Sequence, residues 1–222
     1  MSPSSARRST IPPRRRDEAK ALFRNAILEA AEVVFGERGF HRARIQDVAA
    51  RARIAVGTVY NHFEDKDEVL RALMGERTEE MLGQFEPQAD DPADFEEKLV
   101  VRLARMLRYV EAHRAFFALA AEQGVLGATS ASATALGGKA ARNVTRARGV
   151  FTQLVDDGVA AGALEPGDTV RLSRALGGIL RAVILGALQD GTESIAAEAT
   201  FIARMFLSGA AKPTARASKR AR

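Results

Sequence analysis

The chain has 222 residues, of which 46% are hydrophobic, and a formal net charge of +5, which suits one or two globular domains with a sizeable core. It contains no cysteine, which excludes a disulfide framework and a thiolate metal site. Its basic, polar N-terminus lacks the apolar segment of a secretory signal, and its apolar runs are too short to predict a membrane span.

The positive charge is concentrated at the two ends of the chain. Residues 1–16 contain five arginines and no acidic residue, and residues 212–222 are also basic without an acid. Both segments are rich in Ser, Pro and Ala, so we expect a disordered basic arm at 1–16 and a disordered basic tail at 212–222. The arm precedes the motif described below, and we expect it to follow a phosphate backbone or enter a minor groove. The alternative is a solvated segment that only aids solubility.

A long first helix is predicted from about residue 17 to residue 38. Its apolar residues recur at helical spacing, and the acidic Asp17 and Glu18 suit the positive end of the helix dipole. Gly39 is suited to terminate it. We expect this helix to serve as the platform for the two short helices that follow.

Residues 44–63 predict two short helices joined by a tight turn. Apolar residues of the first helix share one face, namely Ile45, Val48, Ala49 and Ala52. Arg53 interrupts this period, and Val59 and Phe63 then lie four apart on a second inner face. A helix of barely two turns is not stable alone, so it must be docked with its polar residues outward. This pattern is typical of helix-turn-helix proteins, which place a short helix in the DNA major groove.

The segment from about residue 21 to residue 81 resembles the DNA-binding domain of the tetracycline-repressor (TetR) family of bacterial regulators. Order and spacing are kept at the matching residues, which are Ile27 to Ala31, Phe35, Gly39, Phe40, Ile45, Val48, Ala49, Gly57 to Phe63, Lys66, Glu68 and Leu70. This segment is a little over a quarter of the chain, and the remainder matches the family only in length and helical character.

The resemblance implies an all-α protein of about nine helices. An N-terminal three-helix, helix-turn-helix DNA-binding domain is placed at 17–83. A larger helical domain, which binds an effector and forms the dimer, is placed at 91–211.

A set of residues is predicted to contact DNA from the resemblance and from side-chain chemistry: Arg44, Gly57, Thr58, Tyr60, Asn61, His62 and Lys66. Tyr60 and His62 offer donors to phosphate, Thr58 suits phosphate or a thymine methyl, and Asn61 can pair with adenine or phosphate. Lys66 matches the family's phosphate-contacting lysine. For each position the alternative is a solvated surface residue.

The motif departs from the family pattern at its caps. Where the family usually has Thr, Gly and Ser, this chain has Ala43, Arg53 and Ala55. Thr and Ser would cap the two short helices, and each lost cap costs about 1 kcal/mol. Gly is the residue most at ease in a left-handed turn. We therefore expect a docked but less stable motif, in which Arg44 and Arg53 compensate through phosphate contacts.

A connecting helix is predicted to begin after the N-cap Asp65 and to end near residue 85, with the domain boundary at 83–91. Asp91 is then predicted to cap a helix over 92–110, with proline at its first position. Arg102, Arg105 and Arg108 are predicted to lie largely opposite the apolar face of this helix.

Further helices are predicted toward the C-terminus. They are expected at 111–123, at 140–161, from residue 168 to 188, and after a cap at Thr192. The segment 124–141 is rich in Gly, Ala, Ser and Thr and specifies its structure only weakly.

The resemblance implies a small ligand among the central helices that shifts the connecting helix and so releases DNA. The candidate pocket residues are apolar or aromatic with one histidine as a polar anchor: Leu103, Met106, Leu107, Tyr109, His113, Phe116, Phe117, Phe151 and Leu154. A mainly apolar effector is expected from this lining. The alternative for each residue is simple core.

The last two predicted helices are apolar over more of their circumference than a single outer helix needs. We expect them to pair with a second copy across a two-fold axis as a four-helix bundle. The predicted interface residues are Leu176, Ile179, Leu180, Val183, Ile184, Ile202, Met205 and Phe206. Glycines 177, 178 and 186 would allow close approach of another helix. The alternative is an internal core.

These features predict a sequence-specific transcriptional regulator, a repressor that binds a palindromic operator as a homodimer and is released by a small apolar ligand. The expected partners are duplex DNA, an effector and a second copy, without a membrane, cofactor or metal, in the cytoplasm on the nucleoid. An enzyme is disfavoured because His41, His62 and His113 are far apart in sequence and no nucleophile motif is present. The other alternative is an architectural protein that coats DNA without sequence preference and needs no ligand.

Overall fold

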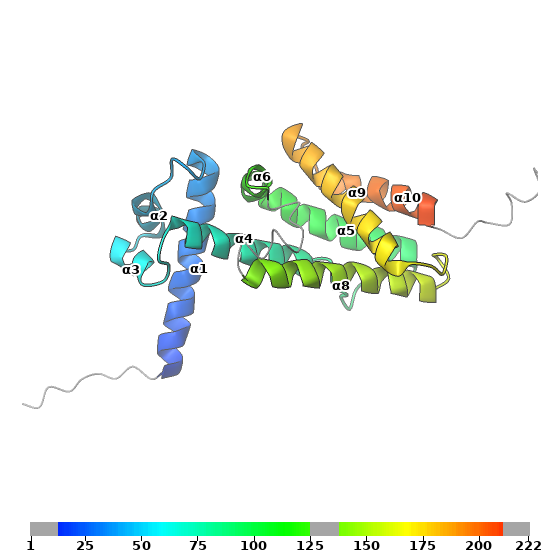
Figure 1. The fold of residues 1–222 in the computed structure, drawn as a ribbon, viewed down its shortest axis with the longest axis horizontal. Helices are drawn as coiled ribbons and strands as arrows, with labels where there is room; N and C mark the ends of the chain where they lie inside the picture. The colour runs from blue at the N-terminus through cyan, green and yellow to red at the C-terminus, as the bar shows by residue number, and fades with distance from the viewer. Residues whose placement is uncertain (1–12, 125–137, 211–222) are drawn as a thin grey trace, which may run out of the picture. The chain divides into compact units, whose positions relative to one another are not determined.

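The computed structural model describes residues 13–124 and 138–210, and all regular elements in these ranges are helices, which confirms the predicted all-α class. The chain divides into two compact units, Met1–Leu70 and Arg71–Arg222, whose helices are drawn in Figure 1. The predictions for residues 1–12, for most of 124–141 and for the C-terminal tail fall outside the described residues.

The first unit contains α1 (Pro13–Arg38), α2 (Ile45–Ala52), α3 (Val56–Tyr60) and the start of α4 (Lys66–Gly83). α2 packs against both α1 and α3. Each helix contributes its apolar face to one core, whose fully buried members include Ile27, Phe35, Val48, Val59 and Phe63. The predicted platform helix and two short helices are therefore all present.

The first helix begins earlier than the sequence pattern predicted. It starts at Pro13 rather than near residue 17, so residues 13–16 belong to α1 and not to a disordered arm. Proline suits the first helical position because its missing N–H would have no intrahelical partner there. At the other end, Gly39 adopts φ +73°, the left-handed conformation predicted for the residue that terminates the helix.

The second unit contains the rest of α4, followed by α5 (Phe95–Ala112), α6 (Arg114–Glu122), α8 (Gly138–Ala160), α9 (Thr169–Gln189), the short 3-10 helix η2 (Ala196–Glu198) and α10 (Ala199–Ala210). Within this unit, α8 packs on α9, and α10 packs on both α5 and α9 (Figure 1). Its core includes side chains with no exposed surface at Leu99, Leu107, Phe117, Leu154 and Leu176.

Aspartate side chains cap the starts of α4, α5 and α9, although not always where predicted. Asp65 caps α4 by accepting the Glu68 N–H at 2.6 Å, as predicted. The cap of α5 is Asp94 rather than Asp91. The final α-helix begins at Ala199 after η2, so the prediction of a helix capped by Thr192 is wrong.

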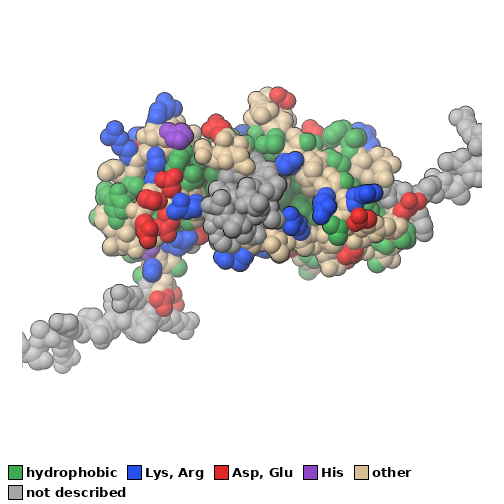
Figure 2. All heavy atoms as spheres, viewed as in Figure 1, with side chains coloured by type: hydrophobic (Ala, Val, Ile, Leu, Met, Phe, Trp, Pro, Cys, Tyr) green, Lys and Arg blue, Asp and Glu red, His purple; other side chains and the backbone are tan. Residues whose placement is uncertain are grey.

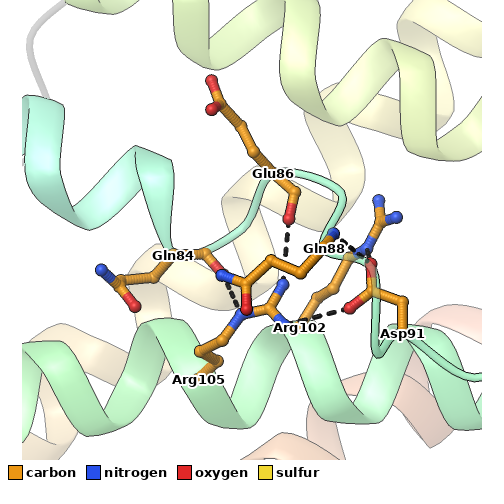
Figure 3. A network of polar contacts seen from close by, with 6 residues as sticks. All are labelled: Gln84, Glu86, Gln88, Asp91, Arg102 and Arg105. Atoms are coloured by element: carbon orange, nitrogen blue, oxygen red, sulfur yellow. Dashed lines mark hydrogen bonds and ion pairs between the residues drawn. The ribbon is translucent and has the colours of Figure 1, made fainter.

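Asp91 anchors the loop between α4 and α5 (Figure 3). Its side chain is only 5% exposed, and it accepts Arg102 Nε at 2.7 Å and Arg105 Nη1 at 3.0 Å. The prediction that both arginines lie opposite the buried face is therefore wrong, because a buried carboxylate draws them inward. Burial acts to raise the pKa of Asp91, but the Gln88 N–H and the two arginines together hold that pKa below its ordinary value.

Arg105 also holds the end of α4. Its guanidinium donates to the carbonyl of Gln84 at 2.6 Å and to that of Glu86 at 2.9 Å (Figure 3). These carbonyls follow the last turn of α4, where the helix itself supplies no partner. One arginine of α5 therefore ties the C-terminal end of α4 to the buried Asp91.

The boundary between the two units falls within α4, between Leu70 and Arg71, whereas the sequence placed it in the loop at 83–91. Most of α4 therefore belongs to the second unit. Side chains of α8 hold it there: Asn143 Nδ2 donates to the Gly75 carbonyl at 2.7 Å, and Arg146 Nη1 lies 3.6 Å from Glu79 Oε1.

The glycines of α9 do not meet a close neighbour inside the described chain. An added Cβ at Gly178 or Gly186 would have no atom within 4 Å, and at Gly177 the nearest is a Phe151 ring atom at 4.0 Å. The predicted close approach therefore does not occur between α9 and another described helix. By length and composition α9 is the one described helix that could cross a membrane, with 28% of its apolar window buried; a single such helix is weak evidence for a span.

Candidate nucleic-acid interface and effector region

The turn between α2 and α3 forces a non-glycine residue into a left-handed conformation. Arg53 adopts φ 57° and ψ 41°, and its N–H donates to the Ala50 carbonyl at 3.2 Å. This is the only non-glycine residue with positive φ among those the structure describes. A Cβ in this region costs about 1–2 kcal/mol, so the turn is made as the motif requires but at a cost in stability, as predicted from the missing glycine.

The side chain of Asp47, inside α2, bonds to the residue that precedes the helix. Asp47 Oδ2 accepts the Arg44 N–H at 3.0 Å, and Oδ1 of the same side chain pairs with Arg38 Nη1 at 2.9 Å. Asp47 thus links the start of α2 to the end of α1. Neither N-cap residue, Arg44 of α2 or Ala55 of α3, makes a side-chain cap bond, so neither of the two missing caps is replaced.

Most of the predicted DNA-contacting residues are accessible. Tyr60 is 51% exposed, Arg44, Gly57 and Asn61 are exposed, and Thr58 and His62 are half-buried, while Val59 and Phe63 on the opposite face are buried. The short helix therefore presents its polar side outward. On the face drawn in Figure 2, basic and acidic side chains are intermingled, so total charge alone would not identify this surface.

His62 lies beside three residues of α1, which are Phe23, Lys20 and Arg24. Its ring centroid is 6.3 Å from that of Phe23. Burial, followed by the nearby charges of Lys20 and Arg24, lowers the pKa of His62. α1 therefore adds two cations to the neighbourhood of a predicted phosphate contact. Helical spacing alone could have suggested the pair, since Lys20 and Arg24 lie four residues apart.

Lys66 is half-buried and turned inward, unlike the other members of the predicted set. Its ammonium donates to the carbonyl oxygens of Phe40 and Ala43 at 2.8 and 3.1 Å. A phosphate contact would have to replace these bonds.

The predicted pocket residues come from three helices of the second unit. α5, the α5–α6 junction and α6 supply an aromatic cluster in which the Tyr109 ring lies 4.4 Å from His113 and 6.2 Å from Phe117, with Phe116 5.0 Å from Phe117. The apolar members are buried, namely Leu103, Met106, Leu107, Phe116, Phe117, Phe151 and Leu154. The set is compatible with either a core or a binding region.

A polar contact from α4 reaches the Tyr109 ring, and the sequence analysis missed it. The Tyr109 hydroxyl donates to Glu80 Oε2, and Arg77 Nη1 pairs with the same oxygen at 2.8 Å. Burial and Glu80 raise the pKa of Tyr109. For Glu80, burial acts to raise the pKa, but the bonds from Tyr109 and Arg77 hold it below its ordinary value. The spacing of 29 residues between Tyr109 and Glu80 gave no local signal.

The predicted interface residues divide into two groups. Leu176, Leu180, Ile184, Ile202 and Phe206 are at most 6% exposed in the single chain. The chain's own core already covers these side chains, so their assignment to an interface stays a prediction. Met205 is 50% exposed, and Ile179 and Val183 are half-buried. Val170 and Phe201 on the same two helices were not in the predicted set and are also exposed, at 47% and 42%.

A short helix with an outward polar face, docked on a two-helix platform and joined to a larger helical unit, defines the class of helix-turn-helix proteins. Residues 27–73 match the family model described as bacterial regulatory proteins of the tetR family. The TetR family predicted from the sequence is therefore confirmed, through the match to its helix-turn-helix domain. Among the described residues no group of three or more His, Cys, Asp or Glu could hold a metal ion.

Curated relatives match only part of the chain. It is 29% identical over 79 residues to the fatty acid metabolism regulator protein of Bacillus subtilis (strain 168) and 42% identical over 62 residues to the HTH-type transcriptional repressor BepR of Brucella suis biovar 1 (strain 1330). These matches cover 36% and 28% of this chain but only 41% and 30% of the two relatives. The relatives are regulators rather than enzymes, although the match spans less than half of each.

Solved structures extend the likeness in fold. The transcriptional regulator FadR from Bacillus subtilis, solved in complex with stearoyl-CoA, has a TM-score of 0.69 at 18% sequence identity, and the match covers 83% of this chain and 97% of that one. At this identity the likeness concerns the fold alone.

Proposed function

We propose that this protein is a sequence-specific transcriptional repressor that binds a palindromic operator as a homodimer and is released by a small, mainly apolar ligand. The observation that carries the proposal is the outward face of α3, where Tyr60 is 51% exposed beside the buried Val59 and Phe63. The exposed ring lies next to the exposed Asn61, so the outward face of this helix offers an aromatic and a polar side chain to another molecule. The family match supports DNA as that molecule.

The test is fluorescence anisotropy of the purified protein with DNA from just upstream of its own gene and with random DNA. We expect a preference of at least about 10³ for the upstream DNA, lost in Tyr60→Ala. Arg108→Ala, which removes an exposed charge from α5 outside the helix-turn-helix, is the control and should bind normally. Equal, steeply salt-dependent binding to both DNAs would instead favour the architectural alternative.

We propose that the effector binds among α5, α6 and α8, next to the aromatic cluster around Tyr109. The bond from Tyr109 to Glu80 supports this region, because it joins a candidate pocket ring to α4, and α4 runs through the boundary between the units. An effector that displaces the Tyr109 hydroxyl would bind more tightly to the protein with the Tyr109–Glu80 bond broken than to the protein with the bond made. Ligand-driven release of DNA requires such a difference in affinity between two states.

Long-chain acyl-CoA is the first effector class to test, because a structural neighbour was solved with stearoyl-CoA. Release of operator DNA by a series of acyl-CoA and free fatty acids would define the class. Tyr109→Phe keeps the ring and removes the donor to Glu80, so it should alter the effector concentration needed for release while leaving operator affinity intact. Unaltered release by every effective compound would remove Tyr109 from the mechanism.

The proposed dimer surface consists of Val170, Ile179, Val183, Phe201 and Met205, on α9 and α10. These side chains are apolar and remain partly or largely exposed in the single chain. Only 28% of the apolar stretch of α9 is buried, so much of that helix is free to contact a second copy. We expect sedimentation to give a dimer at low micromolar concentration, and Met205→Glu to shift it toward the monomer. A monomeric wild-type protein would exclude this surface as a dimer contact.

A further inference from the structure

The ammonium group of Lys66 is turned toward the loop between α1 and α2. Its Nζ donates to the carbonyl oxygens of Phe40 at 2.8 Å, Ala43 at 3.1 Å and His41 at 3.4 Å. A lysine ammonium has three donors, so these acceptors use all of them, with the contact to His41 the weakest. Nζ also lies 4.4 Å from the centroid of the Phe40 ring, where the ring face attracts a cation.

The loop carbonyls depend on this partner. In the described part of the chain, no backbone N–H donates to the carbonyl of Phe40, His41 or Ala43. Phe40 and Ala43 are only 8% and 2% exposed. A buried carbonyl without a partner costs free energy comparable to that of a lost hydrogen bond. The lysine therefore satisfies acceptors that the irregular backbone of the loop leaves open.

The position of Lys66 in its own helix is otherwise unfavourable. It is the first residue of α4, where a positive charge opposes the helix dipole. The next residues, Asp67 and Glu68, are the acids that the dipole favours. A cation at this position is therefore best explained by acceptors outside the helix, and the loop carbonyls are those acceptors.

We propose that Lys66 is a positioning residue of the DNA-binding domain: it fixes the α1–α2 loop against the start of α4 and makes no phosphate contact. Ala43 directly precedes Arg44, the N-cap of α2, so the bond to Ala43 sets where α2 begins. Lys66 follows α3 by only a few residues. The same ammonium thereby restrains the chain on both sides of the helix-turn-helix. The proposal rests on the proposed function for its DNA-binding consequence, although not for its effect on folding.

Lys66→Met keeps the aliphatic stem and removes the ammonium. In the full-length protein we expect the unfolding midpoint of the helix-turn-helix unit to fall by roughly 5 °C. Affinity for the upstream DNA should fall by about 10-fold at every salt concentration, with the slope of log affinity against log salt unchanged. The matched control is Arg44→Met, which removes the same charge from an exposed residue of the motif. Loss of a phosphate contact at Arg44 should make the slope shallower by about 0.9 per site without a change in midpoint.

A shallower slope in Lys66→Met, equal to that of Arg44→Met, would overturn the proposal, as would an unchanged unfolding midpoint. If Lys66→Met does not fold, Lys66→Arg decides, because it keeps the charge that a phosphate contact needs but has a planar fork in place of a compact ammonium. A lower midpoint and weaker binding in Lys66→Arg support the positioning role, and wild-type values overturn it. If the wild-type protein shows no preference for the upstream DNA, the proposed function fails, while the melting comparison still decides the role of Lys66.

Discussion

The two units of this chain use their polar side chains in opposite ways. In the first, Tyr60 and Asn61 lie outside a core made from the other faces of the same short helices. In the second, Arg102 and Asp91 lie inside, each with a side chain about 5% exposed, and they bond to one another across a loop. Polar groups that face outward are available to another molecule, whereas the buried pair holds the α4–α5 loop of its own unit against α5. The first arrangement is compatible with DNA recognition and the second with structural support.

The largest expected effect is the loss of the buried charge in the second unit. Asp91→Asn leaves Arg102 and Arg105 without a counter-charge and should cost about 3–5 kcal/mol, which lowers the unfolding midpoint by roughly 10 °C in calorimetry. Asp90→Asn, at the exposed neighbouring carboxylate, should have almost no effect. Equal effects of the two substitutions would mean that the ion pairs of Asp91 contribute little.

The difference in stability between the wild-type protein and Asp91→Asn should depend on pH, because the pKa of Asp91 is lowered in the folded protein. Because the folded pKa lies below the unfolded value, the stability that the carboxylate contributes is present above about pH 3.8 and is lost as pH falls through the folded pKa. The gap in midpoint between wild type and Asp91→Asn should therefore be constant near neutrality and shrink below about pH 4.

The next effect tests packing in the second unit. A Cβ on Gly158 of α8 would lie 2.5 Å from an atom of the Phe95 ring and 2.8 Å from Leu164. Gly158→Ala should therefore destabilise the protein by about 1–3 kcal/mol through overpacking. Gly149→Ala on the same helix meets nothing within 4 Å and should stabilise by up to about 1 kcal/mol through helix propensity. Thermal unfolding of both variants measures the contrast, and a stabilised Gly158→Ala protein would contradict the observed packing.

The two units also differ in how much of their structure could be predicted from the sequence. The helix-turn-helix is local: the spacing of Ile45, Val48 and Val59 specifies its inner face, and residues close in the chain specify its turn. The interior of the second unit is not local. Spacing identified Leu176 and Ile202 as apolar but could not tell whether their cover comes from the same chain or from a second copy.

Polar contacts inside a unit are the hardest to predict because charge is expected at the surface. Arg105 has the spacing of an outer residue of α5, yet it donates to carbonyls at the end of α4. Lys66 matches a phosphate-binding motif in sequence, yet its donors are used by the neighbouring loop. In both cases the acceptors include two or more backbone carbonyls, which carry no side-chain signal in a sequence.

A smaller effect is expected in the first unit, where stability and DNA binding should change in opposite directions. Arg53→Gly relieves the strain of the left-handed backbone at this position. Glycine also gives the unfolded chain more entropy to lose on folding, so the net stabilisation should be about 0.5–1 kcal/mol. It also removes a predicted phosphate contact and should weaken operator binding. Arg53→Ala removes the same charge without relieving the strain, so it should weaken binding equally and leave stability unchanged. Operator affinity that is unchanged or tighter in Arg53→Gly would end the phosphate hypothesis.

The smallest expected effect concerns the protonation of His62. Burial, Lys20 and Arg24 lower the pKa of His62 in the free protein, so protonation costs folding stability as pH falls below the ordinary value of 6.5. A phosphate beside the ring would favour the charged form instead. DNA binding should then take up a proton, and affinity should rise about threefold as pH falls from about 7.5 to 6.

Anisotropy titrations across this pH range measure how DNA affinity depends on pH, and a nuclear magnetic resonance titration measures the pKa of the His62 ring. His62→Gln should abolish the rise in affinity, whereas His41→Gln, at the exposed histidine of the α1–α2 loop, should retain it. Lys20→Met removes one of the charges that lower the pKa of His62, so the ring should titrate at a higher pH in that variant. A rise that persists in His62→Gln would place the titrating group elsewhere. A flat profile in the wild-type protein would remove His62 from the phosphate contacts and leave the exposed Tyr60 as the stronger candidate on α3.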